Sequence, residues 1–391
     1  MYDFIGIEDT VMKRLYIVFD KTPTRYDGGL ITTYIDTVSE LRDELDIRFL
    51  SIFKSEGMLP PELENIPTST LFNLDIDNRF YKAPSHLAHG SFDSFFKCIW
   101  SALAFFLLIP FARLKTAQLL KDSCVIAPAP ASGMFISSRI KYILEIHTNF
   151  EYFFGDALLG RMQSALMTKP ALTVFRNRTD AQKGSRRFPS DYLYNTFRPV
   201  KSPDNLLERH RHGVLYVGRL AAQKNPDMLI DAAKAVSQRV PGFHLDIYGD
   251  GELAPHLRER INRENLSSVV ALRGFTEDKS VYINYDLLWL TSNYEGFGLV
   301  IIEGEAYGTP CVSTDWGDAS REIVQDGLTG CIAEDFDEFV MKSCELLQNP
   351  SALDEMRKRG IEDFKTRFSS DVHKSNWMRI LESVYGPDSI G

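Results

Sequence analysis

Short apolar runs alternate with longer polar stretches along almost the whole chain, and the series occurs twice. In the first half the runs are RLYIVF, IRFLSIF, CVIAPAP, YILEIHT and ALTVF, and in the second half they are GVLYVGRL, HLDIYGDG, VVALRG, DLLWLTS, PCVST and GCIAE. Several of the stretches between them have helical spacing, such as GGLITTYIDTVSELRDEL after the first run. Such alternation predicts an α/β fold with parallel sheets covered on both faces.

The length and one polar segment divide the chain into two domains. Its 391 residues suffice for two domains of ordinary size, each with a core of its own. The segment YNTFRPVKSPDNLLERHRH holds two prolines, many charges and few apolar residues, so we place the linker near residues 196–212. We expect an N-terminal domain over residues 1–197, a C-terminal domain over 198–370, and a C-terminal helix over 371–391 that crosses back to the first domain.

Composition favours a globular protein of a reducing compartment. The chain is 44% hydrophobic and 25% charged, values typical of soluble domains. No cysteine pair has CxxC spacing, and the five cysteines are far apart, which argues against a disulfide framework and against a zinc site. Acidic residues precede any apolar run at the N-terminus, so no secretory signal is visible and we expect a cytoplasmic location.

One third of this chain has a net positive charge, although the chain as a whole is acidic. The net charge is −9, yet residues 81–200 carry 15 Lys and Arg against 7 Asp and Glu. The uncharged run CIWSALAFFLLIPFA, residues 98–112, lies in this third and is too short to predict a transmembrane helix. We interpret it as a buried helix, with a membrane-contacting helix as the alternative. A basic group nearby is interpreted as a solvated face, with contact to an acceptor phosphate or lipid headgroup as the alternative: Arg176, Arg178, Lys183, Arg186 and Arg187.

The stretch NYEGFGLVIIE, residues 293–303, places Glu295 and Glu303 on either side of a Gly-Phe-Gly turn. We interpret DLLWLTS as a buried strand, NYEGFG as a turn, and LVIIEGEAYG as a short helix that Gly308 and Pro310 end. Because such a turn follows the carboxyl end of a strand, its residues lie where doubly wound sheets bind their ligands.

This turn has the properties of an anion site. Gly296 and Gly298 let a ligand approach the backbone closely, and the amides of Gly298 and Leu299 lie at the positive end of the helix. The two flanking carboxylates accept hydrogen bonds from hydroxyl groups. The pattern therefore predicts an elongated ligand with an anionic middle and polyol ends, as a nucleotide sugar has. Arg219 and Lys224, in GRLAAQKN, would add positive charge for a diphosphate.

These segments resemble the retaining GT-B glycosyltransferases of family 4. The resemblance rests on the order and spacing of GVLYVGRLAAQKNPDMLIDA, LDIYGDGEL, LRGF, SNYEGFGLVIIEGEAYGTPCVSTDWG and EIVQDGLTGCI. It is strong over residues 213–335, whereas the first half matches only in DGGL at 27–30 and IHTNF at 146–150. It implies two facing Rossmann-like domains with a cleft between them. The C-terminal domain would bind a nucleotide sugar, without a metal or other cofactor.

The resemblance also assigns roles to individual residues. Arg219 and Lys224 would hold the diphosphate and Glu303 the ribose hydroxyls, while Glu295 would hold the donor sugar with backbone amides. The remaining residues of this substrate-binding set are Gly218, Gly296, Phe297, Gly298 and Leu299.

In the first half the resemblance rests on fewer residues. His147 matches the histidine that reaches the donor sugar, and Gly28 and Gly29 match the glycine-rich turn that approaches the phosphates and the acceptor. Taken alone, His147 would be interpreted as a partly buried structural histidine.

The resemblance does not account for three features of the sequence. Gly304 and Glu305 stand where the family has alanine and a bulky apolar residue, so local packing must favour the glycine. GDGELA imitates a dinucleotide fingerprint, but Arg273 stands where an acid is expected, which disfavours an NAD(P) enzyme. His86 and His89 have metal-ligand spacing without an acidic partner, and we interpret them as part of a loop.

We therefore expect a retaining, metal-independent glycosyltransferase that moves a hexose from a UDP- or GDP-linked donor to an acceptor hydroxyl. The acceptor would belong to a glycan, a lipid-linked sugar or an anionic polymer. Two alternatives are a GT-B phosphorylase or sugar-phosphate synthase, and a catalytically silent GT-B partner subunit. The basic third predicts an anionic membrane surface as a further partner, and no nucleic-acid partner is expected.

Overall fold

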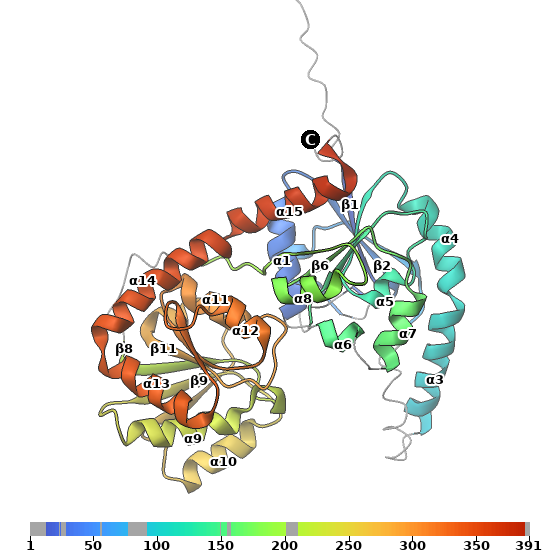
Figure 1. The fold of residues 1–391 in the computed structure, drawn as a ribbon. Coiled ribbons are helices and arrows are strands. Elements are labelled where there is room, and N and C mark those ends of the chain that lie inside the picture. Colours follow the sequence, from blue (N-terminus) through green and yellow to red (C-terminus); the bar gives the residue numbers. More distant parts are fainter. Residues whose placement is uncertain are drawn as a thin grey trace, which may run out of the picture. The chain divides into compact units, whose positions relative to one another are not determined.

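The chain forms two compact units (Figure 1). The computed structural model describes residues 13–22, 24, 29–54, 57–76, 92–148, 150–154, 158–200 and 210–387. Unit 1 comprises residues 1–175, 181–191 and 374–391, and unit 2 comprises residues 176–180 and 192–373. Gly28, His86, His89 and most of the predicted linker lie outside the described residues.

Unit 1 is built on a seven-stranded sheet in the order β3-β2-β1-β4-β5-β6-β7. The strands are β1 (Arg14–Phe19), β2 (Asp46–Phe53), β3 (Thr68–Phe72), β4 (Cys124–Ala127), β5 (Ile143–Ile146), β6 (Leu172–Phe175) and β7 (Ser190–Tyr192). Neighbouring strands from β3 to β6 pair in parallel. Five of these strands were predicted from apolar runs, whereas β3 and β7 were not.

Helices cover this sheet. They are α1 (Gly29–Leu41), η1 (Pro61–Leu63), α3 (Phe92–Leu107), α4 (Ile109–Leu119), α5 (Pro130–Gly133), α6 (Phe150–Phe154), α7 (Leu158–Leu166), α8 (Arg178–Gly184) and the last helix, α15 (Ser370–Tyr385). In α15, Trp377, Ile380 and Leu381 are fully buried, and the Tyr385 hydroxyl lies 2.8 Å from the Val125 amide nitrogen. The end of the chain therefore contributes to the core of unit 1.

Unit 2 repeats the arrangement with six parallel strands in the order β10-β9-β8-β11-β12-β13. The strands are β8 (His210–Val217), β9 (His244–Tyr248), β10 (Val270–Gly274), β11 (Tyr285–Leu290), β12 (Cys311–Thr314) and β13 (Gly330–Ala333). The helices are η3 (Ala222–Lys224), α9 (Pro226–Ser237), α10 (Ala254–Arg263), η4 (Lys279–Asn284), α11 (Leu299–Ala306), α12 (Asp318–Ile323), α13 (Phe336–Gln348) and α14 (Pro350–Arg367). All six strands coincide with predicted runs.

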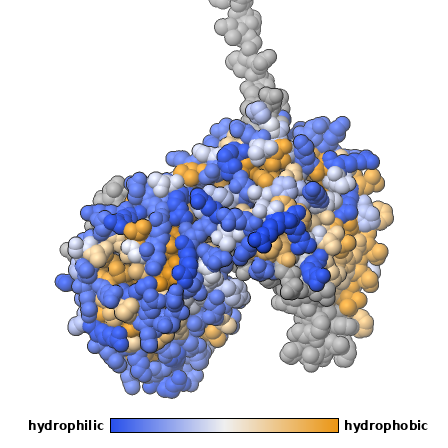
Figure 2. All heavy atoms as spheres, viewed as in Figure 1, coloured by the Kyte–Doolittle hydropathy of each residue, from blue (hydrophilic) through white to orange (hydrophobic). Residues whose placement is uncertain are grey.

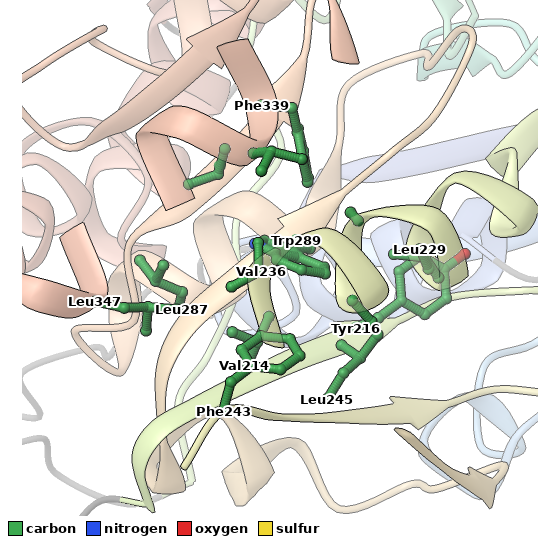
Figure 3. Close-up of a cluster of buried hydrophobic side chains, with 14 of the residues drawn as sticks. Val214, Tyr216, Leu229, Val236, Phe243, Leu245, Leu287, Trp289, Phe339 and Leu347 are labelled. Atoms are coloured by element: carbon green, nitrogen blue, oxygen red, sulfur yellow. The ribbon is translucent and has the colours of Figure 1, made fainter. Parts of the chain in front are cut away.

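A buried aromatic group fixes one face of the second sheet (Figure 3). Trp289 on β11 is fully buried, and its ring centroid lies 5.6 Å from that of Phe243 and 5.3 Å from that of Phe339 on α13. Leu229 and Val236 from α9 belong to the same cluster. Side chains from the sheet and from two helices therefore form one core on this face.

The apolar run of residues 98–112 is only half buried, so its interpretation as a buried helix is wrong for one face. The run forms two helices, with a turn at Leu108, and Trp100, Leu107 and Phe111 are exposed. No single helix among the described residues is long and apolar enough to cross a membrane. Phe96–Leu107 and Ile109–Leu119 meet that test only as a pair, bent by 49°.

The basic group that follows is also not a uniform solvated face. Arg176 is 1% exposed, and its guanidinium reaches the Leu193 carbonyl oxygen at 3.5 Å. The Arg178 guanidinium lies 5.0 Å from the ring centroid of Tyr192. The interpretation of these arginines as solvated is therefore wrong for Arg176, whose charge lies inside the fold. The five cysteines are all buried and free.

Candidate active site in the second unit

The strand order of unit 2 reverses between β8 and β11, and ligands of doubly wound sheets bind at such a point, beyond the carboxyl ends of the strands. The loops that follow these two strands are joined by hydrogen bonds. The Asn293 amide donates to the Gln223 carbonyl at 2.9 Å, and the Thr291 hydroxyl donates to the Lys224 carbonyl at 2.9 Å. Residues 222–224 and 291–295 therefore form one rigid rim.

This rim brings Lys224 and Glu295 together. Lys224 Nζ lies 2.5 Å from Glu295 Oε1, and the same oxygen accepts a hydrogen bond from Ser292 Oγ at 2.5 Å. The two charged side chains are 19% and 8% exposed. A cation and a carboxylate held in a largely dry setting interact more strongly than in water, which fixes both side chains in one geometry. Ser292, which the sequence reasoning missed, orients the carboxylate.

Gly218 is required by packing beneath this rim. A Cβ atom at Gly218 would lie 2.9 Å from the Tyr216 hydroxyl oxygen. Burial, and after it the negative charge of Glu295, raises the pKa of Tyr216 above its usual range. The tyrosine therefore stays protonated under Glu295, and its hydroxyl donates to the Arg219 carbonyl at 3.4 Å.

Arg219 takes a different position from Lys224. Its side chain is 71% exposed, and Nη2 lies 3.5 Å from Glu252 Oε1 at the start of the segment before α10. The structure thus brings Lys224 and Glu295 into contact and leaves the Arg219 guanidinium in solvent at the rim.

The GDGELA segment packs against the first loop. A Cβ at Gly249 would lie 1.8 Å from the Gly218 carbonyl oxygen, and one at Gly251 would lie 2.5 Å from that of Leu220. The two glycines therefore permit contact between two loops of this unit. Arg273, which replaces the acid of a dinucleotide site, pairs with Asp246 at 3.0 Å.

Helix α11 begins directly after the Gly-Phe-Gly turn. Gly298 has φ +84°, a left-handed conformation that glycine adopts readily, and Leu299 is the first helical residue. The side chain of Phe297 is 4% exposed and packs against Phe368, with ring centroids 6.1 Å apart. Phe297 therefore anchors the turn through its ring, and only its backbone is placed to contact a ligand.

Glu303 is buried one turn into α11, and its carboxylate is already engaged. Lys279 Nζ lies 2.8 Å from Oε1, and the Tyr282 hydroxyl donates to Oε2. The Glu303 side chain is 5% exposed and that of Lys279 is 37% exposed. Sequence reasoning missed Lys279 and Tyr282, which lie on η4 more than twenty positions earlier. In the sequence they are marked only by the segment KSVY, residues 279–282, which precedes the buried strand β11.

The two residues that depart from the family pattern are both buried, and packing explains Gly304. A Cβ at Gly304 would lie 2.7 Å from the Thr309 carbonyl oxygen, and the Thr309 amide donates to the Gly304 carbonyl at 2.7 Å. Only a glycine allows this close return of the chain. Glu305 is 1% exposed, and burial, followed by the nearby Asp363 carboxylate, holds its pKa well above the usual range.

The residues predicted in the first half lie in unit 1. His147 follows β5, its side chain is 14% exposed, and Nε2 lies 3.4 Å from the Tyr34 hydroxyl on α1. The same hydroxyl donates to Glu145 Oε2 at 2.5 Å, and Glu145 is fully buried. Tyr34 and Glu145, neither of them predicted, therefore position His147. Gly29 is the first residue of α1.

Residues 211–349 match the protein family described as glycosyl transferases group 1. This range lies within unit 2 and contains both loops of the rim. This part of unit 2 is therefore similar to the group 1 glycosyl transferases. The Lys224–Glu295 pair thus lies in the part of the chain that carries the family match, whereas His147 lies outside it.

Sequence relatives of this chain are aligned over part of their length. Mannosylfructose-phosphate synthase of Agrobacterium fabrum is 34% identical over 172 residues, which are 40% of this chain and 38% of that protein. Poly(glycerol-phosphate) alpha-glucosyltransferase of Bacillus subtilis is 31% identical over 129 residues, or 32% and 19% of the two chains. The alignments thus span well under two thirds of these relatives.

Solved structures resemble this chain over nearly its whole length. HepE of Anabaena in complex with UDP has a TM-score of 0.72 at 19% identity, covering 95% of this chain and 100% of that one. A variant of S. aureus TarM in complex with UDP and alpha-GlcNAc-glycerol has a TM-score of 0.71 at 14% identity, with the same coverage. The predicted GT-B fold is confirmed.

Proposed function

We propose that the protein is a retaining glycosyltransferase that moves a hexose from a UDP-sugar to an acceptor hydroxyl, without a metal ion. The observation that carries the proposal is the Lys224–Glu295 pair, held at the switch point of the second sheet beside the N-terminus of α11. UDP in the structures of HepE and TarM supports the choice of nucleotide.

The proposed chemistry follows from this placement. Departure of the sugar leaves positive character on its anomeric carbon and adds negative charge to the diphosphate. Lys224, Arg219 and the first amides of α11 would stabilise that growing charge, and Glu295 would orient the sugar hydroxyls. The acceptor hydroxyl would attack from the face that the diphosphate leaves, passing its proton to the departing phosphate. The anomeric configuration is then retained.

Ligand-dependent unfolding and product analysis test the proposal. UDP at 100 times its dissociation constant should stabilise the protein by about 2.7 kcal/mol, and ADP should stabilise it less. Nuclear magnetic resonance of the product from a UDP-hexose should show the anomeric configuration of the donor. A protein that no nucleotide stabilises, or a product of inverted configuration, would refute the corresponding part of the proposal.

A sugar-phosphate synthase is the second candidate, because mannosylfructose-phosphate synthase is among the relatives. Such an enzyme uses a phosphorylated sugar as acceptor. Transfer that requires a hexose phosphate and fails with neutral glycans would favour this candidate, and the donor site would be the same.

Glu303→Gln is expected to raise the donor KM on the order of tenfold and to lower kcat less. The reason is that ribose contacts change little between the ground state and the transition state. Glutamine keeps the size of the side chain and a hydrogen bond to Tyr282, while the charge facing Lys279 is lost. Initial-rate kinetics against donor concentration measure the effect, with the exposed Glu334→Gln as the matched control. A collapse of kcat at unchanged KM would place Glu303 at the reacting atoms.

Chelation is expected to leave activity within about twofold of the untreated enzyme. The positive charge for the leaving diphosphate comes, in this proposal, from Lys224, Arg219 and the N-terminus of α11. Transfer rates measured before and after EDTA treatment check this. Loss of activity with EDTA and its recovery with Mg²⁺ or Mn²⁺ would refute the metal-free mechanism.

A further inference from the structure

Helices α3 and α4 carry a continuous apolar stripe on their solvent-facing side. Figure 2 shows hydrophobic side chains along the edge of unit 1 that these helices form in Figure 1. Between Ile99 and Leu114, a stretch that is described throughout, every exposed position is apolar. The large side chains of the stripe are between 42% and 68% exposed, and they are Phe96, Ile99, Trp100, Leu103, Leu107, Phe111 and Leu114.

The spacing of these residues places them on one side of each helix. They recur every three or four positions, which is the period of an α-helix. In water, such a stripe would normally face the protein core. Here it faces outward along two consecutive helices, and a contiguous apolar surface of this kind marks an interaction site.

The opposite side of the same helices is packed against unit 1. Cys98, Ser101 and Phe105 are at most 2% exposed, and the rings of Phe105 and Phe135 lie 4.8 Å apart. In α4, Thr116 Oγ1 donates to the Phe135 carbonyl at 3.0 Å, and Arg113 Nε donates to the Met134 carbonyl at 3.0 Å. The helices are therefore fixed to the fold through this side, and the stripe lies on the other side.

The charges beside the stripe are mostly positive. Helices α3 and α4 contain Lys97, Arg113 and Lys115 but one acid, Asp93, and neighbouring α7 contains Arg161 and no acid. One of these cations, Lys97, is paired with Asp75 at 3.3 Å. Arg113 Nη2 reaches the Leu166 carbonyl at 2.5 Å, so α7 adjoins α4 on this side. A Trp-, Phe- and Leu-rich stripe flanked by cations is the pattern of helices that lie in the surface of an anionic bilayer.

We propose that this stripe docks unit 1 on an anionic lipid surface, with α3 and α4 lying in the plane of the interface. The side chains from Phe96 to Leu114 enter the boundary between headgroups and acyl chains, where Trp100 is an interfacial anchor. The buried sides of both helices stay on the protein core. The inference concerns a surface of unit 1 and does not depend on the proposed transfer reaction.

Co-sedimentation of the purified protein with vesicles tests the docking. Vesicles of phosphatidylglycerol and phosphatidylcholine in about equal parts should bind the protein at low salt, and binding should weaken as salt is added. Trp100→Glu combined with Leu103→Glu should weaken binding on the order of tenfold or more. Met58→Glu is the matched control, because Met58 is 66% exposed in the same unit but outside these helices, and it should bind like the wild type.

Fluorescence of the unmodified protein gives a second measurement that needs no variant. Trp100 is 67% exposed, Trp316 is partly buried, and Trp289 and Trp377 are fully buried. Docking should therefore shift the tryptophan emission to the blue, and brominated acyl chains should quench it. Failure to bind anionic vesicles at low salt, or equal binding by all variants, would overturn the proposal. A different result would be a protein that does not bind vesicles but forms concentration-dependent dimers, which Trp100→Glu combined with Leu103→Glu abolishes. That result would assign the stripe to contact with a second copy of the chain instead.

Discussion

Lys224→Ala is expected to lower turnover on the order of 10²-fold or more, the scale seen when one donor to a transition state is removed. Lys224 is a largely buried cation at the switch point, and its ammonium is held by Glu295 in the absence of a ligand. The proposed diphosphate gains charge as the sugar leaves, so a preorganised cation stabilises the transition state more than the ground state. Steady-state release of UDP at saturating donor measures the effect.

Two controls separate this effect from loss of folding. Lys234→Ala removes a cation from α9 that is 52% exposed and should leave turnover unchanged. Circular dichroism of Lys224→Ala checks that the fold persists, since the substitution leaves the Glu295 carboxylate without its ammonium partner. A folded Lys224→Ala protein with wild-type turnover would contradict the assignment of the diphosphate site.

Glu305→Gln is expected to stabilise the protein, by a margin that grows as the pH rises. Burial, and then Asp363, raises the pKa of Glu305 well above its usual range, so the folded state keeps the proton while the unfolded chain releases it above about pH 4.3. The wild type therefore loses up to about 1.4 kcal/mol of unfolding free energy per pH unit above that value, until the folded pKa is reached. Glutamine is neutral at every pH and lacks this loss.

Urea unfolding of both proteins at several values between pH 5 and pH 8 measures the margin. The groups that face Glu305 are Asp363, Thr329 and Arg367, and Asp363 is itself paired with Arg367 at 2.8 Å. Glu345→Gln, at an exposed position on α13, is the control and should follow the wild type. A Glu305→Gln protein whose stability runs parallel to that of the wild type across this range would show that Glu305 is ionised in the fold.

The sheets could be predicted because buried parallel strands are continuous apolar runs. Segments such as DLLWLTS meet water on neither face, so their composition alone identifies them. Strand β3 was missed because it lies at the sheet edge, where Thr68, Ser69 and Thr70 are exposed and no apolar run forms. The run that became α3 and α4 was misinterpreted because apolar composition does not show which side of a helix is covered.

The candidate site could be predicted in its residues but not in its contacts. The sequence indicated Lys224 and Glu295, and the two loops meet because parallel strands β8 and β11 are neighbours. It did not show that Glu303 is engaged by Lys279 and Tyr282, because helix spacing describes only local neighbours. Gly304 depends in the same way on a return of the chain at Thr309. The roles of all these residues in catalysis stay predictions.

The core of unit 1 can be completed only after helix α15 has been translated. Trp377, Ile380 and Leu381 are fully buried in unit 1, and yet they are translated after unit 2, which ends at His373. At about 5 to 20 residues per second, synthesis of unit 2 takes roughly 10 to 40 seconds. Throughout that interval the nascent first unit lacks its last helix, and the apolar surface under Trp377 is open to solvent and to chaperones. Unit 1 is thus translated before unit 2 but completes its core after it.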